Sequence, residues 1–208
     1  MHALTSPGGL RELTSGSALE VAPALLGAVL SHTTAEGTVS VRLTEVEAYL
    51  GVGEDPGSHA HRGQTPRTSP MFGPPGHLYA YFTYGMHVCI NVVCSPVGTA
   101  SAVLLRAGEV VAGQELASLR RGERVSARDL ARGPARLTVA LGVALAQSGD
   151  DLAADPFELV LPERRLAMVA GPRTGVGGPG GGAAYPWRFS VPGEPTVSPY
   201  KRSPRAVD

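Results

Sequence analysis

The sequence of 208 residues is poor in lysine, cysteine and aromatic residues. Lys201 is the single lysine, so arginine supplies 17 of the 18 basic residues and side-chain amine nucleophiles are scarce. The two cysteines, Cys89 and Cys94, are too few for a disulfide framework. The formal net charge is zero. Taken alone, this charge argues against a nucleic-acid-binding protein, because such proteins usually carry a basic surplus.

Long apolar segments are also missing. No run of about 18 apolar residues is available to form a membrane span, and residues 1–16 lack the apolar core of a signal peptide. These absences favour a cytoplasmic protein that does not bind membranes. Hydrophobic residues still make up 43% of the chain, which is enough for one core and excludes a wholly disordered chain.

Glycine and proline are abundant, with 27 and 18 residues, and predict many loops between short elements. The length predicts one folded domain over residues 17–202, between a flexible leader over 1–16 and a disordered tail over 203–208. The glycine-rich run at 175–182 predicts a mobile surface loop, because it lacks the lysine–serine end of a phosphate-binding loop.

Residues 38–50 alternate apolar and polar side chains and predict a β-strand. The alternation slips by one residue near Thr44 and Glu45, which indicates a β-bulge. Beyond the bulge, Glu45, Glu47 and Tyr49 point to the same face. A carboxylate at the base of an aromatic-lined cleft is a candidate general base, or a group that stabilises a cationic transition state. The alternative is a pair of solvated carboxylates on a strand.

Six of the eleven aromatic residues lie between Tyr49 and Tyr84. Residues 78–93 predict a β-hairpin that turns at Tyr84 and Gly85, with two other tyrosines on one face. Such a cluster can stack on planar ligands such as nucleic-acid bases, although tyrosine is also a common strand residue. A bulky side chain at a hairpin tip cannot easily reach a core. Tyr84 is therefore expected to project, as do the side chains that wedge between base steps.

Weaker patterns predict the remaining elements and an uneven distribution of charge. We expect helices over 18–30, capped by Ser17, over 110–121 and over 136–146, and strands over 100–106, 157–161 and 187–191. Residues 57–108 contain no acid, and residues 116–136 contain six arginines. Either the molecule has one basic face and one acidic edge, or the arginines only solvate a helix.

The histidines and cysteines do not predict a metal site. The spacing of His59, His61, His87, Cys89 and Cys94 matches none of the closed tetrahedral zinc patterns. Cys89 also falls on a predicted strand, where a buried thiol is ordinary. We therefore expect neither a metal nor another cofactor.

Six segments together carry a resemblance to a known family. They are TEVEAYLG at 44–51, QTPR at 64–67, MFGPPGHLYAYFTYGMHVCINVV at 71–93, AVLLRAGEV at 102–110, ARGPARL at 131–137 and PWRF at 186–189. The sequence resembles the 3-methyladenine DNA glycosylase family of the alkyladenine type over about residues 15–202.

The resemblance implies a mixed α/β domain over 17–202 with a curved antiparallel sheet, flanking helices and a protruding hairpin that inserts into the DNA minor groove. It also implies a monofunctional DNA glycosylase that flips alkylated or otherwise damaged purines out of the duplex. The enzyme then hydrolyses the N-glycosidic bond and leaves an abasic site for base excision repair. Its expected partner is damaged double-stranded DNA. We expect it to act as a monomer in the bacterial cytoplasm.

By position in these motifs, the resemblance assigns the general base to Glu47 rather than Glu45, and places Arg106 near the catalytic water. A carboxylate can deprotonate water and stabilise the oxocarbenium-like sugar that forms as the base departs. A water nucleophile also fits the scarcity of amines, because glycosylase–lyases need an amine to form a Schiff base. Lys201 and the N-terminus both lie in peripheral segments.

The same motifs assign the residues that hold the base. Tyr49, His59 and Tyr81 correspond to the pocket that sandwiches the flipped base. Asn91 corresponds to a residue associated with excluding the guanine amino group. Tyr84 corresponds to the residue that fills the gap left in the duplex.

Two other classes of protein stay open on the residues alone. A non-catalytic reader of nucleic acid uses the same aromatics and arginines but does not need Glu47. A hydrolase of free nucleosides does not need Tyr84 or the arginine-rich stretch.

Overall fold

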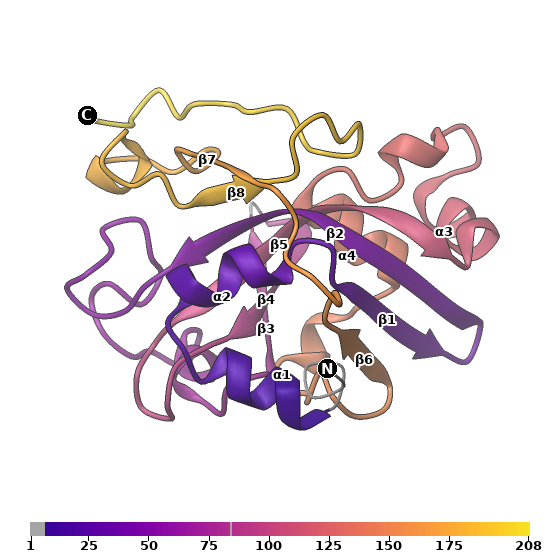
Figure 1. Ribbon diagram of the computed structural model, residues 1–208, viewed down its shortest axis with the longest axis horizontal. Helices are drawn as coiled ribbons and strands as arrows, with labels where there is room; N and C mark the ends of the chain where they lie inside the picture. The colour runs from indigo at the N-terminus through magenta and orange to yellow at the C-terminus, as the bar shows by residue number, and fades with distance from the viewer. Residues whose placement is uncertain (1–6, 84) are drawn as a thin grey trace.

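Eight strands form one antiparallel sheet in the computed structural model, which describes residues 7–83 and 85–208 (Figure 1). The strands follow the order β3-β4-β5-β2-β1-β6, and β8 pairs with both β2 and β7. Their bounds are Val29–Thr34 (β1), Gly37–Tyr49 (β2), Leu78–Thr83 (β3), His87–Val93 (β4), Ala102–Ala112 (β5), Phe157–Val160 (β6), Val169–Gly171 (β7) and Arg188–Ser190 (β8). The fold is the predicted mixed α/β domain with a strongly curved sheet.

Four α-helices flank the sheet within the described residues. They are α1 (Pro7–Thr14), α2 (Ala18–Leu25), α3 (Gln114–Arg121) and α4 (Pro134–Leu141). Short 3₁₀ turns lie at Ser69–Phe72, Ala127–Asp129, Leu145–Gln147 and Pro179–Gly181. None of the helices in the described part of the chain is long and apolar enough to cross a membrane.

The central strand β2 has partners along both edges. It pairs with β5 on one edge, and with β1 and then β8 on the other. The register against β5 shifts on both sides of Glu45, which confirms the predicted bulge. Because both edges are paired, Glu45 and Glu47 lie inside the sheet rather than at a solvated edge, and both are fully buried.

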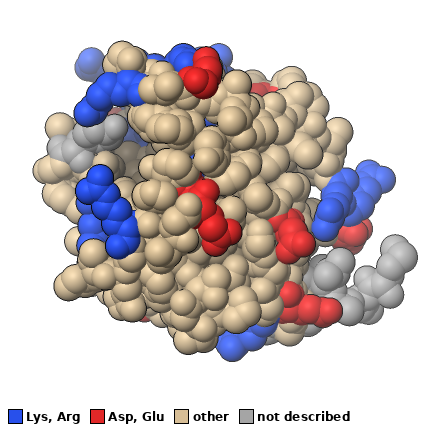
Figure 2. Space-filling view, turned by 90° about the vertical axis from the view of Figure 1, so that its left-hand side faces the viewer, with Lys and Arg blue, Asp and Glu red and all other residues tan. Residues whose placement is uncertain are grey.

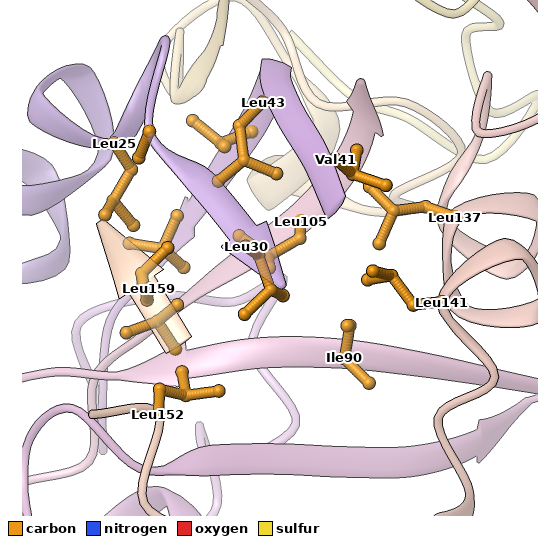
Figure 3. Close-up of a cluster of buried hydrophobic side chains, with 14 of the residues drawn as sticks. Leu25, Leu30, Val41, Leu43, Ile90, Leu105, Leu137, Leu141, Leu152 and Leu159 are labelled. Carbon is orange, nitrogen blue, oxygen red and sulfur yellow. The ribbon is translucent and has the colours of Figure 1, made fainter. Parts of the chain in front are cut away.

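The hydrophobic core covers one face of the sheet (Figure 3). Side chains from β1, β2, β4 and β5 meet leucines of α2 and α4 there, among them Leu25, Leu30, Val41, Leu43, Ile90, Leu105, Leu137 and Leu141. Burial of each such side chain contributes roughly 1.5–3 kcal/mol. This packing fixes the face of the sheet, so the alternate residues of the same strands point to the opposite side.

Several predicted bounds differ from the structure. Ser17 caps α2 through a capping box with Glu20, as predicted, but the helix ends at Leu25. Gly27, with φ +85°, then turns the chain into β1, a strand that the sequence pattern did not reveal. Strand β5 continues to Ala112, so the helix expected over 110–121 begins only at Gln114.

The predicted hairpin is formed by β3 and β4. Pairing runs from Leu78 with Val92 to Thr83 with His87. Gly85 has φ +68°, the left-handed conformation that a tight turn requires. Tyr84, expected at the tip, lies outside the described residues.

Both ends of the chain contact the domain where the sequence predicts a leader and a tail. Part of the expected leader forms α1, in which Leu10 is buried against the core. At the other end, the Gly178 N–H donates to the carbonyl oxygen of Arg205, and the Val207 N–H donates to that of Gly178. Figure 1 shows this C-terminal segment running alongside β7 and β8.

Candidate active site

A cleft of about 370 Å³ lies on the face of the sheet opposite the core. Its lining alternates with the core residues along the same strands: Tyr79 and Tyr81 on β3, Cys89 and Asn91 on β4, Leu104 and Arg106 on β5. Tyr49, loop residues 56–59 and 174–177, and Pro134 at the start of α4 complete the walls. The cleft therefore brings together residues more than 120 positions apart in the sequence.

Glu47 lies fully buried beside the cleft and accepts hydrogen bonds on both carboxylate oxygens. The Tyr49 hydroxyl donates to Oε2 at 2.8 Å, and the Thr174 N–H donates to Oε1 at 2.7 Å. Arg106 Nη1 lies 3.4 Å from Oε2. Tyr49, Thr174 and Arg106 all line the cleft, so the carboxylate is separated from it only by its own partners.

Glu45 faces the same side but belongs to a closed ion-pair network. Its Oε1 accepts from Arg106 Nε at 2.9 Å and from Arg188 Nε at 2.6 Å, and its Oε2 accepts from the Ser198 N–H at 2.7 Å. Burial alone raises the pKa of Glu45, but the charges of Arg106 and Arg188 and the Ser198 hydrogen bond hold it below its usual value. Glu45 is therefore a structural anion.

Arg106 connects the two carboxylates. Burial opposes its charge, yet Glu47 and Glu45 together raise the pKa of Arg106, so the guanidinium stays charged. The pair of solvated carboxylates considered from the sequence is wrong, because both glutamates are fully buried and hydrogen-bonded.

Aromatic rings form two sides of the cleft. His59 meets Tyr81 edge-on, with ring centroids 4.7 Å apart, and Tyr79 lies 5.5 Å from Tyr81 on the same side. Tyr49 extends from β2 and is fixed by its hydrogen bond to Glu47. Burial and the charge of Glu47 raise the pKa of Tyr49, so its hydroxyl remains a neutral donor.

Asn91 is buried in the cleft wall and held in one orientation. Its Nδ2 donates to the carbonyl oxygen of Tyr79 at 3.0 Å, across the β3–β4 hairpin. Of the seven site residues predicted from the sequence, six lie in or directly beside this one cleft. The seventh, Tyr84, lies outside the described residues.

Charge does not gather on the face drawn in Figure 2. Lys and Arg side chains lie there at separate places, with uncharged surface and acidic side chains between them. This face therefore gives no support to one continuous basic surface.

A family model described as methylpurine-DNA glycosylase matches residues 12–195, most of the chain. The chain belongs to the methylpurine-DNA glycosylase family. Membership places it among the hydrolases that act on N-glycosyl bonds.

Curated relatives agree with the family assignment. A protein from Leifsonia xyli is 63% identical over 205 residues, covering 97% of this chain and 95% of the relative. One from Streptomyces avermitilis is 53% identical over 196 residues, covering 92% and 91%. Both carry the name "Putative 3-methyladenine DNA glycosylase".

A buried ion pair fixes one wall of the cleft. The sequence did not predict this pair. Arg173 and Asp55 are both fully buried and form two hydrogen bonds of 2.6 Å. Asp55 also accepts from the Leu50 and Gly57 N–H groups, while Arg173 donates to the carbonyl oxygens of Ala48 and Gly180. The partners lie 118 residues apart, so no local pattern reveals the pair.

The same pair supports Tyr49 and the glycine-rich segment. The Arg173 guanidinium lies over the Tyr49 ring, 4.4 Å from its centroid. Gly180 and Gly181 are buried where a mobile surface loop was predicted over 175–182, because Gly180 packs against Gly57 and Arg173 with no room for a side chain. Packing thus explains the glycines at these two positions.

Thr174 is a third residue, after Asp55 and Arg173, that sequence reasoning did not single out for a role. It lines the cleft next to Glu47, and its buried Oγ1 has no hydrogen-bond partner among the residues that the structure describes. A buried hydroxyl without a partner is costly, so Thr174 Oγ1 is a polar atom at the cleft whose hydrogen-bonding capacity the described residues leave unused.

Proposed function

We propose that this protein is a monofunctional DNA glycosylase that removes alkylated or otherwise damaged purines and leaves an abasic site for base excision repair. One observation carries the proposal: a fully buried carboxylate, Glu47, lies directly behind an aromatic-lined cleft whose polar residues reach it. The names of the relatives support a purine methylated at N3 as one substrate.

Glu47 acts as the general base for a water molecule. The contact with Arg106, at 3.4 Å, is the longest of its three contacts, so a water that replaces it touches both side chains. Arg106 and the Thr174 hydroxyl orient this water, and Glu47 takes its proton. The Glu47 charge also stabilises the oxocarbenium-like sugar as the base departs.

The flipped base lies between Tyr49 on one side and His59 with Tyr81 on the other. His59 and Tyr81 touch each other edge-on, so these two residues together form one wall. Purines alkylated at N3 or N7 carry positive charge and are attracted to tyrosine faces by roughly 1–2 kcal/mol. Their charge also makes them good leaving groups, so little acid catalysis is needed.

Asn91 restricts which purines enter. Its hydrogen bond to Tyr79 prevents the side chain from moving aside. A guanine amino group directed at Asn91 therefore meets a fixed amide rather than a flexible one. This accounts for discrimination against undamaged guanine in a cleft whose walls accept any planar ring.

The β3–β4 hairpin enters the minor groove, and Tyr84 fills the gap left by the flipped nucleotide. Two apolar side chains near the turn support this role, because Phe82 is 48% and Met86 is 68% exposed. Exposed apolar side chains at a hairpin end are typical of wedges that unstack bases. The protein acts as a monomer on chromosomal DNA in the cytoplasm.

Water, rather than an amine, is the nucleophile. The side chain of Lys201 is exposed and does not line the cleft, although its carbonyl oxygen accepts from the Gly175 N–H. A Schiff base needs an amine at the sugar. Among the residues that the structure describes, those that line the cleft include no lysine.

Incubation with methylated duplex DNA tests the proposal. Released methylated purines, abasic sites, and no complex trapped by borohydride are the expected results. A reader of nucleic acid would bind without releasing bases, and a nucleoside hydrolase would act on free methylated nucleosides instead. A borohydride-trapped complex that disappears in Lys201→Ala would contradict the water mechanism.

A further inference from the structure

A second hollow, of about 410 Å³, lies between the end of α3 and the start of α4. Five arginines line it: Arg121, Arg124, Arg128, Arg132 and Arg136. They belong to the arginine-rich stretch of the sequence, and the turn of the chain from the end of α3 through a connecting loop into α4 directs them to one hollow.

The charge in this hollow is not balanced by acids. Asp129 is the single acidic residue of its lining and already pairs with Arg128 and Arg132. Within the described part of the chain, Arg121, Arg124 and Arg136 take part in no ion pair. Glu123, the other nearby acid in sequence, lines a different hollow.

Backbone carbonyl oxygens hold two of the five arginines in place. Arg121 Nε donates to the carbonyl oxygen of Leu130, and Arg132 Nε donates to that of Val197. Burial and the charge of Arg136 lower the pKa of Arg121, while Asp129 partly offsets this effect. The side chains of Arg124 and Arg136 are exposed, so an anion at the surface can reach both of them.

The hollow adjoins the candidate active site. Arg132 and Arg136 lie on either side of Pro134, which lines the base cleft, and all three fall within about one helical turn of the start of α4. Arg132 also forms an isolated β-bridge with Ala107, the neighbour of Arg106. The hollow and the base cleft are therefore both lined by residues at the start of α4.

We propose that this hollow binds a backbone phosphate of the DNA strand that carries the flipped nucleotide. The inference rests on the proposed function, which supplies a DNA strand at the cleft. Guanidinium groups bind phosphate through paired hydrogen bonds, and several converging arginines form a strong site for it. The arginines of the hollow give the protein a local basic surface despite its zero net charge.

The salt dependence of binding to a short duplex that carries one stable abasic-site analogue, which is readily flipped, tests the hollow directly. The variant R124Q/R136Q removes two charges from it without breaking an ion pair. The control R164Q/R165Q removes two exposed charges elsewhere. Each lost phosphate contact lowers the slope of log affinity against log salt by about one. We expect the smaller slope in R124Q/R136Q. The control should keep the wild-type slope, and R124K/R136K should recover it because lysine restores both charges.

Four outcomes overturn the inference. Three of them concern the salt slope: it is unchanged in R124Q/R136Q, it falls equally in the control R164Q/R165Q, or it does not recover in R124K/R136K. The fourth is tight binding of inorganic phosphate alone that vanishes in R124Q/R136Q while the slope for DNA stays unchanged. The proposed function is judged separately, by release of methylated purines from duplex DNA by the wild-type protein. A wild-type protein that excises bases but fails the slope test rejects only the hollow.

Discussion

Glu45 and Glu47 lie on the same face of β2 but accept hydrogen bonds from different partners. Glu45 accepts from two arginines and a backbone N–H, and none of these contacts lines the cleft except Arg106. Glu47 accepts from residues that all line the cleft. The sequence pattern placed both residues on one face and the family resemblance chose Glu47 as the base; their contacts give the physical reason, since Glu45 is held as a structural anion and Glu47 adjoins the cleft.

Glu45→Gln should destabilise the protein by about 3–5 kcal/mol, because it leaves Arg106 and Arg188 buried beside a neutral amide. Urea denaturation measures this loss. Since the folded-state pKa of Glu45 is lowered, its contribution is present above the ordinary carboxyl value and is lost as the pH falls toward the folded-state value. The wild-type protein should therefore lose its advantage over the variant in acid. Equal stability of the two proteins at neutral pH would contradict the network.

His59 should make excision of cationic purines sensitive to acid. Desolvation and the charge of Arg67 lower the pKa of His59, so the ring is neutral at pH 7 and becomes positive only below its ordinary value. A positive His59 repels 7-methylguanine more than neutral hypoxanthine. The ratio of their single-turnover rates should fall in the wild-type protein as the pH drops below the ordinary histidine pKa of about 6.5. The ratio should stay constant in His59→Gln; a falling ratio in that variant would exclude His59 as the cause.

At the scale of elements, strands in which apolar and polar residues alternate could be predicted. Elements that depend on long-range contacts could not. Strand β2, its bulge and the β3–β4 hairpin follow from period-two patterns and a turn glycine. Strand β1 has no such pattern, because it is fixed by pairing with β2 and β6. The Asp55–Arg173 pair could not be predicted either, because the two residues lie 118 positions apart in loops that only the fold brings together.

The hairpin should matter only where a base stack must be replaced. Tyr84→Ser is expected to weaken binding to a damaged duplex more than to the same damaged single strand, because a single strand has no stack to fill. Binding titrations with both substrates measure the difference. An equal loss on both would indicate that Tyr84 supports the fold instead of the duplex.

At the scale of the whole molecule, the formal net charge of zero argued wrongly against a nucleic acid as the partner. Charge is distributed locally: acids and arginines pair over much of the surface, while the hollow beside α4 keeps unpaired arginines. The family resemblance predicted the curved antiparallel sheet, and its motifs named six residues that lie in or beside the cleft. They could not predict which charges pair, because pairing depends on the folded arrangement of distant segments.

Excision should survive removal of divalent metals. No group of three or more metal-ligating side chains is close enough to hold an ion in the described ranges 7–83 and 85–208, and the proposed chemistry needs only Glu47 and water. Single-turnover rates with and without EDTA should agree. Loss of activity in EDTA that zinc restores would require a different mechanism.

Glu47→Gln tests the central claim most directly. The substitution keeps the shape and the hydrogen bond from the Thr174 N–H but removes the charge and the basicity. Glu158→Gln, which changes an exposed glutamate on β6 in the same way, is the matched control. Single-turnover excision of a methylated purine should fall at least about 10²-fold in Glu47→Gln. DNA binding should be nearly unchanged, and the control should behave as wild type. Normal excision by a folded Glu47→Gln protein would remove Glu47 from catalysis.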